Sequence, residues 1–443
     1  MTSSHRLLTE ENFFRRVDAW AAEAMRGGAR TFGDLLHRLP GVYPTELLAS
    51  LDRLVAKGAL DGASAATMRQ QCEVKDGLPA EGRSLLPLPH PLDFEWRFTS
   101  ETSRTLLDQA VALTRPGDEL LLFGTPGLAV EALSLPVDRK TTLLAEANSV
   151  TNRLVALNRA TGSPLNIAFC NAGLPRESAN AVLLDPPWYP DFVRPMLAAA
   201  AHACQLGGFV LISLPPDGAR PSAVTDRRAA VAFGDRLGLS LQEHHPLTIG
   251  YETPFFERNA LGATGITAPA QWRRGDLMIF RKTGSPARPP ASSSHTRGWT
   301  EITIGRMRLF IRARAGIREG RCGLISILDG DVLPTVSRRD PRRQAADVWT
   351  SGNRIFSTDN PQLVLEAAIS CVGEAVGSGI QPGLWGRVGD RDAIERVAAD
   401  LRDLALLENA EESGAANDGI ERNLVWKSSS KNYSSMSRAI PSG

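Results

Sequence analysis

The feature that most constrains the fold is a series of short apolar runs, each ending in a polar or glycine-bearing turn. These runs lie at 119–123, 141–145, 165–170, 181–184 and 208–213. Helix-length segments separate most of them, as parallel strands require. Segments at 239–244 and 277–281 predict two last strands, partly antiparallel. The sequence therefore predicts an α/β protein with a doubly wound, Rossmann-like sheet, which binds ligands at its carboxyl edge.

The fourth run carries the strongest chemical signal, because it ends in Asp185, Pro186, Pro187 and Trp188, with Tyr189 next. The Asp185 carboxylate can accept a hydrogen bond from an exocyclic amine. The carbonyl between the prolines can accept a second, since the rigid turn leaves that oxygen free. The Trp188 indole can stack on a planar ring. The motif predicts group transfer to an amine nitrogen, with these four residues as the catalytic set and Tyr189 beside the substrate.

Glycine and polar residues follow the earlier runs at corresponding positions. Phe123 ends the first run, and Gly124 and Gly127 form a turn where the backbone can approach a ligand before a helix begins. Glu146 closes the second run, close to the roughly 20 residues expected across one strand-helix-strand unit. Asn171 closes the third. All of these residues are expected on one edge of the sheet.

In this order the motifs of residues 100–283 resemble the class I S-adenosylmethionine-dependent amino-methyltransferases with an Asp-Pro-Pro-Trp motif, of the adenine N6 type. The resemblance implies a methyltransferase with S-adenosyl-L-methionine as cofactor. Glu146 would bind the cofactor's ribose, Asn171 would lie near its adenine, and Phe123, Gly124 and Gly127 would contact it. It implies adenine N6 of DNA or RNA as the acceptor, flipped out or single-stranded.

Two features depart from that family. A Thr-Pro pair separates the two glycines, and the cofactor turn precedes the catalytic motif. Enzymes with tryptophan in the motif often have the reverse order.

Two other functions stay open. The N-terminal helices, the glycine turn, Leu174-Pro175 and the Asp-Pro-Pro-aromatic motif also resemble the branched-chain polyamine synthases. Those enzymes transfer an aminopropyl group from decarboxylated S-adenosylmethionine to a polyamine, and their cofactor turn is strongly acidic, whereas this one is uncharged. The third alternative is a non-catalytic DNA-binding regulator on a methyltransferase scaffold.

Composition and turn signals divide the chain into segments. They are a helical, winged helix-turn-helix-like domain (1–84), a proline-rich strap (85–99), the methyltransferase domain (100–283), a linker (284–298), a C-terminal α+β domain of unknown role (299–407) and a disordered tail (408–443).

Two regions predict nucleic acid as the partner. In the N-terminal domain the longer helix at 45–57 would be the recognition helix, but it carries only Arg53 and Lys57, offset by Glu46 and Asp52. A structural or dimerising helical domain is therefore the favoured alternative to a DNA reader there. Residues 301–356 contain 11 arginines against 6 acidic residues, a local net charge of +5, interleaved with Trp349. Such a surface suits phosphate contacts and base stacking, although pairing of these arginines with the nearby acids is an equal alternative.

One more arginine is predicted to bind substrate. Arg258 follows the sixth expected strand, and by position it would lie beside the acceptor pocket and hold a phosphate.

Composition limits the remaining options. The net charge of +1 gives no overall attraction to nucleic acid, so any such surface is local. The scattered cysteines form no Cys-x-x-Cys pair, which argues against a metal site or a disulfide framework. No apolar stretch reaches membrane-spanning length and the N-terminus lacks a signal peptide, so we expect a cytoplasmic protein without membrane contact. The oligomeric state stays open.

Overall fold

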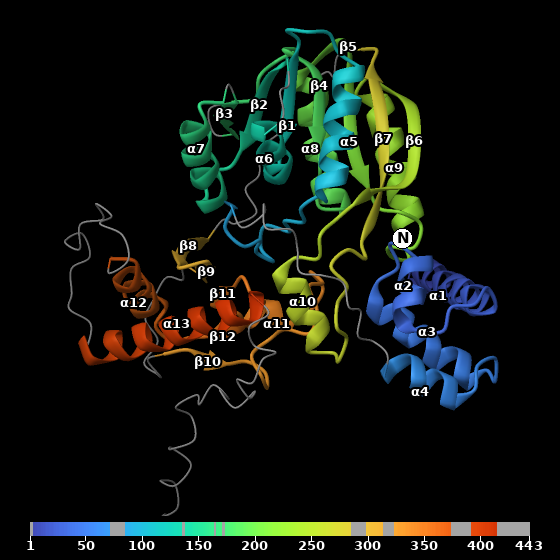
Figure 1. The fold of residues 1–443 in the computed structure, drawn as a ribbon, viewed down its shortest axis with the longest axis vertical. Helices are drawn as coiled ribbons and strands as arrows, with labels where there is room; N and C mark the ends of the chain where they lie inside the picture. Colours follow the sequence, from blue (N-terminus) through green and yellow to red (C-terminus); the bar gives the residue numbers. More distant parts are fainter. Residues whose placement is uncertain are drawn as a thin grey trace, which may run out of the picture. The chain divides into compact units, whose positions relative to one another are not determined.

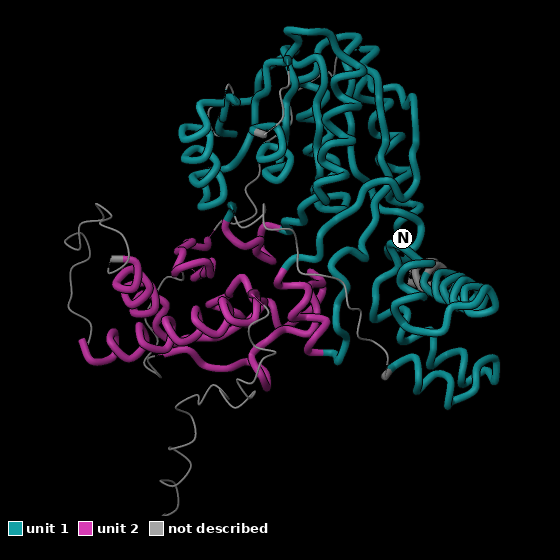
Figure 2. The backbone as a smooth tube through the Cα atoms, in the orientation of Figure 1, with its two compact units in different colours: residues 1–86, 94–254, 264–294 teal, residues 87–93, 255–263, 295–443 magenta. Residues whose placement is uncertain are grey.

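A computed structural model describes residues 3–70, 85–134, 138–163, 165–170, 173–284, 298–312, 323–373 and 391–413. The chain forms two compact units, coloured separately in Figure 2. The first comprises residues 1–86, 94–254 and 264–294, and the second comprises residues 87–93, 255–263 and 295–443. The expected strap at 85–99 is therefore divided between the units.

The first unit contains a seven-stranded sheet in the order β3-β2-β1-β4-β5-β7-β6 (Figure 1). Its strands are β1 (Glu119–Phe123), β2 (Lys140–Ala145), β3 (Asn166–Phe169), β4 (Ala179–Leu184), β5 (Cys204–Leu214), β6 (Leu239–Gly250) and β7 (Arg274–Lys282). Strands β1 to β5 pair in parallel, and β7 runs antiparallel to both β5 and β6. The predicted doubly wound fold and its partly antiparallel end are confirmed.

Helices cover both faces of this sheet because successive strand residues point to opposite sides. On β1, Leu120 and Leu122 face one apolar cluster while Leu121 faces the other. The first cluster includes residues of α5 (Ser100–Ala112), α6 (Pro126–Ser134) and α7 (Ser149–Thr161). The second includes residues of α8 (Pro190–Ala203) and α9 (Ala223–Arg236). This burial on both faces leaves the strand ends as the place for polar chemistry.

Four helices begin the chain, as expected for a helical N-terminal region. They are α1 (Ser3–Arg26), α2 (Phe32–Arg38), α3 (Pro44–Ala56) and α4 (Gly62–Gln70). Helix α2 begins with a capping box in which the Thr31 side chain accepts from the Asp34 N–H and the Asp34 carboxylate accepts from the Thr31 N–H. Within residues 3–70 a helix, not a strand, follows α3, so those residues contain no wing; the rest of the predicted domain, 71–84, lies outside the described residues.

The second unit is α+β, as predicted. Its five-stranded antiparallel sheet has the order β10-β12-β11-β9-β8. The strands are β8 (Trp299–Ile304), β9 (Met307–Arg312), β10 (Ile325–Ser326), β11 (Val348–Thr350) and β12 (Ile355–Ser357), and the helices are α10 (Phe255–Gly262), α11 (Arg342–Ala345), α12 (Pro361–Gly373) and α13 (Arg391–Glu412).

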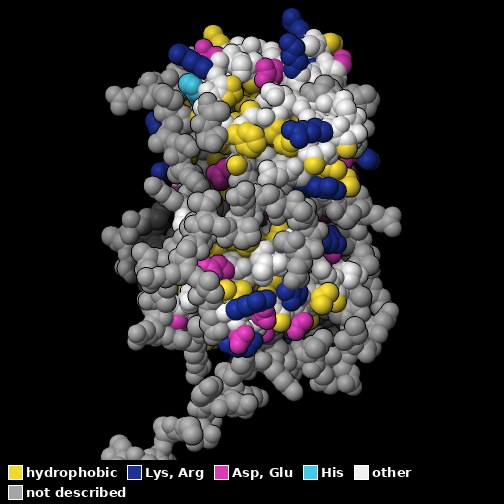
Figure 3. Space-filling model, turned by 90° about the vertical axis from the view of Figure 1, so that its left-hand side faces the viewer, with side chains coloured by type: hydrophobic (Ala, Val, Ile, Leu, Met, Phe, Trp, Pro, Cys, Tyr) yellow, Lys and Arg dark blue, Asp and Glu magenta, His cyan; other side chains and the backbone are white. Residues whose placement is uncertain are grey.

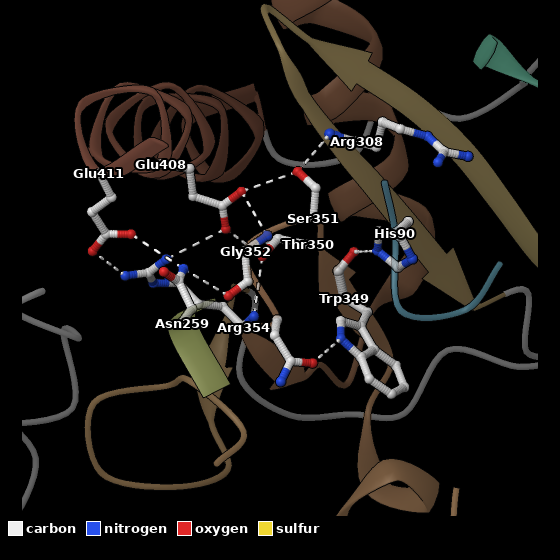
Figure 4. Close-up of polar contacts among 11 residues, drawn as sticks. His90, Asn259, Arg308, Trp349, Thr350, Ser351, Gly352, Arg354, Glu408 and Glu411 are labelled. Carbon is white, nitrogen blue, oxygen red and sulfur yellow. Dashed lines mark hydrogen bonds and ion pairs between the residues drawn. The ribbon is translucent and has the colours of Figure 1, made fainter. Parts of the chain in front are cut away.

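Helix α13 continues past the predicted domain end at 407 because its last turns hold a buried carboxylate. Glu408 accepts hydrogen bonds from the Thr350 hydroxyl, from the Ser351 hydroxyl at 3.2 Å and from the Gly352 N–H at 3.0 Å (Figure 4). These donors lie on β11 and the turn that follows it. The contact joins α13 to the sheet.

Among the described residues, none of the helices combines the length and the apolar composition that a bilayer crossing needs.

Candidate active site

Asp185 lies at the carboxyl end of β4, in the middle of the sheet of the first unit. Tyr251, which follows β6, donates a hydrogen bond from its hydroxyl to Oδ1 of Asp185 over 2.6 Å. The Ser213 hydroxyl on β5 lies 2.5 Å from the Tyr251 oxygen. Since the Tyr251 proton is donated to Asp185, Ser213 is the donor to Tyr251. The three side chains form a hydrogen-bonded chain that ends on the carboxylate.

The environment of Asp185 changes its acidity. The side chain is partly buried, and desolvation raises the pKa of Asp185 to about 7, although the Tyr251 hydrogen bond, the Arg273 charge and Ser213 act in the opposite direction. Burial and the neighbouring Asp185 charge raise the pKa of Tyr251 well above its ordinary value. Near neutral pH Asp185 therefore exists as both acid and carboxylate, which suits a group that accepts and releases a proton.

The two prolines direct Trp188 onto the sheet. The Tyr189 N–H donates to the Pro187 carbonyl over 2.6 Å and closes a tight turn. Trp188 is only 6% exposed. A Cβ atom on Gly275 of β7 would lie 2.8 Å from Cζ2 of Trp188, so only glycine lets the indole come this close to the strand. Trp188 thus belongs to the packed wall of the site.

The guanidinium of Arg273 lies against three aromatic rings around Asp185. Its Cζ atom is 4.0 Å from the ring centroid of Trp188, 4.2 Å from that of Trp96 and 5.5 Å from that of Tyr251. The Trp96 and Trp188 rings stand at 89° and 80° to the Tyr251 ring. Cations are attracted to aromatic faces at such distances. The ring face predicted to stack on a substrate is occupied by Arg273.

Tyr189, predicted beside the substrate, packs against other side chains of the first unit. The Arg220 guanidinium lies 5.2 Å from its ring centroid, and the Phe94 ring lies 6.2 Å away. Arg220 also donates to the Trp188 carbonyl. These contacts fix the turn after the catalytic motif, and a direct substrate contact of Tyr189 stays a prediction.

Arg258 lies on α10, which belongs to the second unit, whereas the other predicted site residues belong to the first. Its guanidinium lies 5.6 Å from the ring centroid of Phe255. Burial lowers the pKa of Arg258. Its predicted contact with an acceptor phosphate remains a prediction.

The predicted cofactor residues follow the ends of neighbouring strands. Phe123, the last residue of β1, is in register with the ends of both β2 and β4. Gly124, Glu146 and Asp185 therefore come directly after adjacent strands. Gly124 has a φ of 67°, which favours glycine at the turn. Asn171 lies outside the described residues.

Two groups at this edge are available to bind a cofactor. The Thr125 hydroxyl is buried, and its Oγ1 has no hydrogen-bond partner among the described residues. The exposed Glu146 carboxylate makes no hydrogen bond or ion pair within the described chain, and partial desolvation raises its pKa. Gly127 is in ordinary contact with the Arg97 side chain, 3.6 Å from where a Cβ would stand. An unpaired hydroxyl and a carboxylate beside a glycine turn fit a ribose-bearing ligand.

Sequence reasoning missed two residues of this site. Ser213 is a hydroxyl at the end of an apolar strand, a pattern that could have drawn attention to it. Arg273 gave no signal, because it is one of two adjacent arginines at the start of β7 and only the fold brings it to Trp188. Trp96 comes to the site from the strap and Tyr251 from the segment after β6.

The basic residues predicted to bind nucleic acid are largely engaged within the protein. On α3, Arg53 and Lys57 both form ion pairs with Asp18 of α1, at 2.9 and 2.7 Å. In the second unit Arg308 pairs with Asp93 and Glu301 at 2.5 and 2.6 Å. Further arginines of the region bind carboxylates or backbone carbonyls, namely Arg306, Arg312, Arg342, Arg343 and Arg354. On the face drawn in Figure 3 the coloured basic and acidic side chains are interspersed.

No protein-family model and no curated protein matches the chain. The branched-chain polyamine synthase C9 mutein of Thermus thermophilus is 16% identical, covers 67% of this chain and 99% of its own, and has a TM-score of 0.46. A methyltransferase from Pyrococcus furiosus is 17% identical, covers 41% of this chain and 81% of its own, and has a TM-score of 0.29. Similarity at these identities and TM-scores assigns neither an activity nor a substrate to this chain.

Proposed function

We propose that this protein is an S-adenosylmethionine-dependent transferase that methylates an amine nitrogen of its substrate, held beside the Asp185 carboxyl group. The observation that carries the proposal is the Ser213–Tyr251–Asp185 chain at the carboxyl edge of β4, next to the glycine turn and Glu146. In doubly wound sheets this edge is where ligands bind.

The cofactor would be held by the groups that lack partners. Gly124 would let its backbone approach, the Thr125 hydroxyl would gain a hydrogen bond, and the Glu146 carboxylate would accept from two ribose hydroxyls. When bound, S-adenosylmethionine supplies an electrophilic methyl group on a sulfonium.

Asp185 would orient the amine and take its proton. Its carboxylate form accepts a hydrogen bond from the amine N–H, which points the nitrogen lone pair away from Asp185. A pKa of about 7 lets the same oxygen hold the proton and then return it to solvent. Tyr251 fixes the carboxylate by donating to its Oδ1, and the packed aromatic wall limits water. The contribution is positioning and proton transfer.

The acceptor predicted by the motif is adenine N6 in DNA or RNA. The described basic residues do not favour that acceptor, because most of those predicted to bind phosphate are paired with acids or carbonyls. Nucleic-acid contact would then depend on other side chains. The second candidate is aminopropyl transfer to a polyamine, which one observation favours: a cation already lies among the aromatic rings beside Asp185.

The first test is calorimetric titration of the protein with S-adenosylmethionine and with its decarboxylated form. We expect binding of S-adenosylmethionine that is weakened in Glu146→Ala and unchanged in Glu101→Ala, which removes an exposed glutamate of α5. Preference for the decarboxylated form would favour aminopropyl transfer. Absence of binding to both would favour the non-catalytic scaffold and contradict the proposal.

A second test follows labelled methyl groups into candidate acceptors: single-stranded DNA, RNA and small amines. Loss of Asp185 as proton acceptor in Asp185→Asn should lower the rate by about 10²-fold or more. Asp235→Asn, at an exposed position of α9, is the matched control. Equal rates in the wild type and in Asp185→Asn would refute the role of Asp185.

A further inference from the structure

The three rings around the Arg273 guanidinium have the arrangement of an aromatic cage for a cation. Two indoles, Trp96 and Trp188, lie within 4.2 Å of the guanidinium carbon, and Tyr251 closes a third side. All three belong to the first unit. Cages of this kind recognise organic cations by the negative faces of their rings. The protein fills this cage with its own side chain.

The Arg273 guanidinium can move out of the cage while the Arg273 backbone keeps its position. The Arg273 carbonyl accepts a hydrogen bond from the Tyr251 N–H over 3.1 Å, which anchors the chain just before β7. The Arg273 side chain is partly exposed to solvent. An arginine side chain has several rotatable bonds, so its head can move while the backbone hydrogen bond is kept.

Charge decides what can replace it. Arg273 stabilises the Asp185 carboxylate electrostatically. A neutral ring in its place would leave that carboxylate, partly buried, without this counter-charge, which is unfavourable. A planar cation would restore both the stacking and the charge balance. The incoming cation then has the same charge as the Arg273 guanidinium and the same planar thickness.

We infer that the Trp96–Trp188–Tyr251 cage is the acceptor subsite, that it takes a planar guanidinium-type cation, and that Arg273 is its internal occupant until the acceptor arrives. The assignment of this cation as the acceptor rests on the proposed function, whereas the cage itself can be tested without cofactor. It names a planar cationic amine as the acceptor in place of adenine N6, the acceptor that the motif predicts.

The test measures binding of three probes to the whole protein by calorimetry: n-butylguanidinium, n-butylammonium and adenosine. They separate a planar cation, a compact cation and a neutral planar ring. In the wild type the tethered guanidinium competes at an effective concentration in the millimolar range, so removing it in Arg273→Ala should tighten n-butylguanidinium binding by about tenfold or more. Arg236→Ala, which removes an arginine lying over the single ring of Phe233, should leave it unchanged.

Further variants keep the result interpretable. Adding Trp96→Leu to Arg273→Ala should abolish the gain, because one wall of the cage is lost. If Arg273→Ala does not fold, Arg273→Gln takes its place, and the rise of its thermal midpoint with n-butylguanidinium is compared with the rise with n-butylammonium. A larger rise with n-butylguanidinium supports the inference.

Three results would overturn it. The first is equal affinity of the wild type and the Arg273 variant for n-butylguanidinium. The second is that the variant binds adenosine more tightly than n-butylguanidinium, and the third is that it binds n-butylammonium more tightly than n-butylguanidinium. Titration with S-adenosylmethionine separates this failure from failure of the proposed function. If the protein binds the cofactor but not n-butylguanidinium, only the assignment of the cage is wrong. If it binds n-butylguanidinium but not the cofactor, the proposed transferase function is wrong.

Discussion

Replacing Asp185 with asparagine should make the protein more stable relative to wild type as the pH rises. The folded protein holds the Asp185 proton up to a pKa of about 7, whereas the ordinary value is 3.8. A pKa that is higher in the folded state means that the folded state binds the proton more tightly, so stability falls as the pH rises from about 4 to about 7. Asparagine carries no charge at any pH and removes this loss.

The magnitude follows from the pH interval. Between pH 5 and pH 8.5 the unfolded carboxyl is ionised throughout, while the folded one changes from acid to carboxylate. The two pH units from 5 to the folded pKa correspond to about 2.7 kcal/mol at about 1.36 kcal/mol per unit. Since Asp185 is partly exposed, solvent screening makes this an upper value.

The assay is urea unfolding of wild type, Asp185→Asn and Asp235→Asn, followed by tryptophan fluorescence at several pH values. Titrations of other groups are common to all three proteins and cancel in the difference. The advantage of Asp185→Asn over wild type should grow by about 2 kcal/mol from pH 5 to pH 8.5, while Asp235→Asn stays parallel to wild type. Parallel curves for Asp185→Asn would show that Asp185 ionises normally and would refute its raised pKa.

Three further substitutions test the packing around the site, an ion-pair cluster of the N-terminal helices and a buried contact of the second unit. Gly275→Ala places a methyl group against the Trp188 ring and should cost about 1–3 kcal/mol in urea unfolding and reduce cofactor-dependent turnover. Asp18→Ala leaves two cations of α3 without their shared carboxylate and should destabilise the protein by about 1–3 kcal/mol; a larger loss in high salt than in low salt would contradict the ion pairing. Gly352→Ala puts a Cβ into the Glu408 carboxylate and should cost about 2 kcal/mol or more, and a neutral result would refute the buried contact.

The strands of the sheet could be read from the sequence because each is a local signal. Leu120, Leu121 and Leu122 are all apolar since a central parallel strand is buried on both faces, and the residues after each strand reach the same edge by topology. Gly124, Glu146 and Asp185 were therefore placed on one edge by pattern alone. Which side chains would close over Asp185 was not a local property, because Tyr251 and Arg273 come from segments far along the chain.

The basic residues show the opposite case. A count within a window treats every arginine as a surface charge, yet Arg308 is fully buried and pairs with Asp93, more than 200 residues earlier. Arg53 and Lys57 are likewise separated by more than 30 residues from the Asp18 carboxylate that binds them. Ion pairs of this separation leave no periodic trace in the sequence. Local charge therefore could not show which of these cations are paired inside the protein, and nucleic acid as a partner stays a prediction.

The acidity of Asp185 and the position of Arg273 have a common origin in the packing of Trp188. Gly275 lets the indole lie on β7, and the wall that results removes water from the carboxyl and raises its pKa. The same wall offers an aromatic face, which attracts a cation that partly lowers the pKa again. If Arg273 leaves, water enters and the positive charge departs, and these two changes act on Asp185 in opposite directions. A planar cation that seals the cage would exclude the water, which raises the pKa of Asp185, and return the positive charge, which lowers it. A neutral acceptor would exclude the water without returning the charge, and both changes act to raise the pKa of Asp185 further.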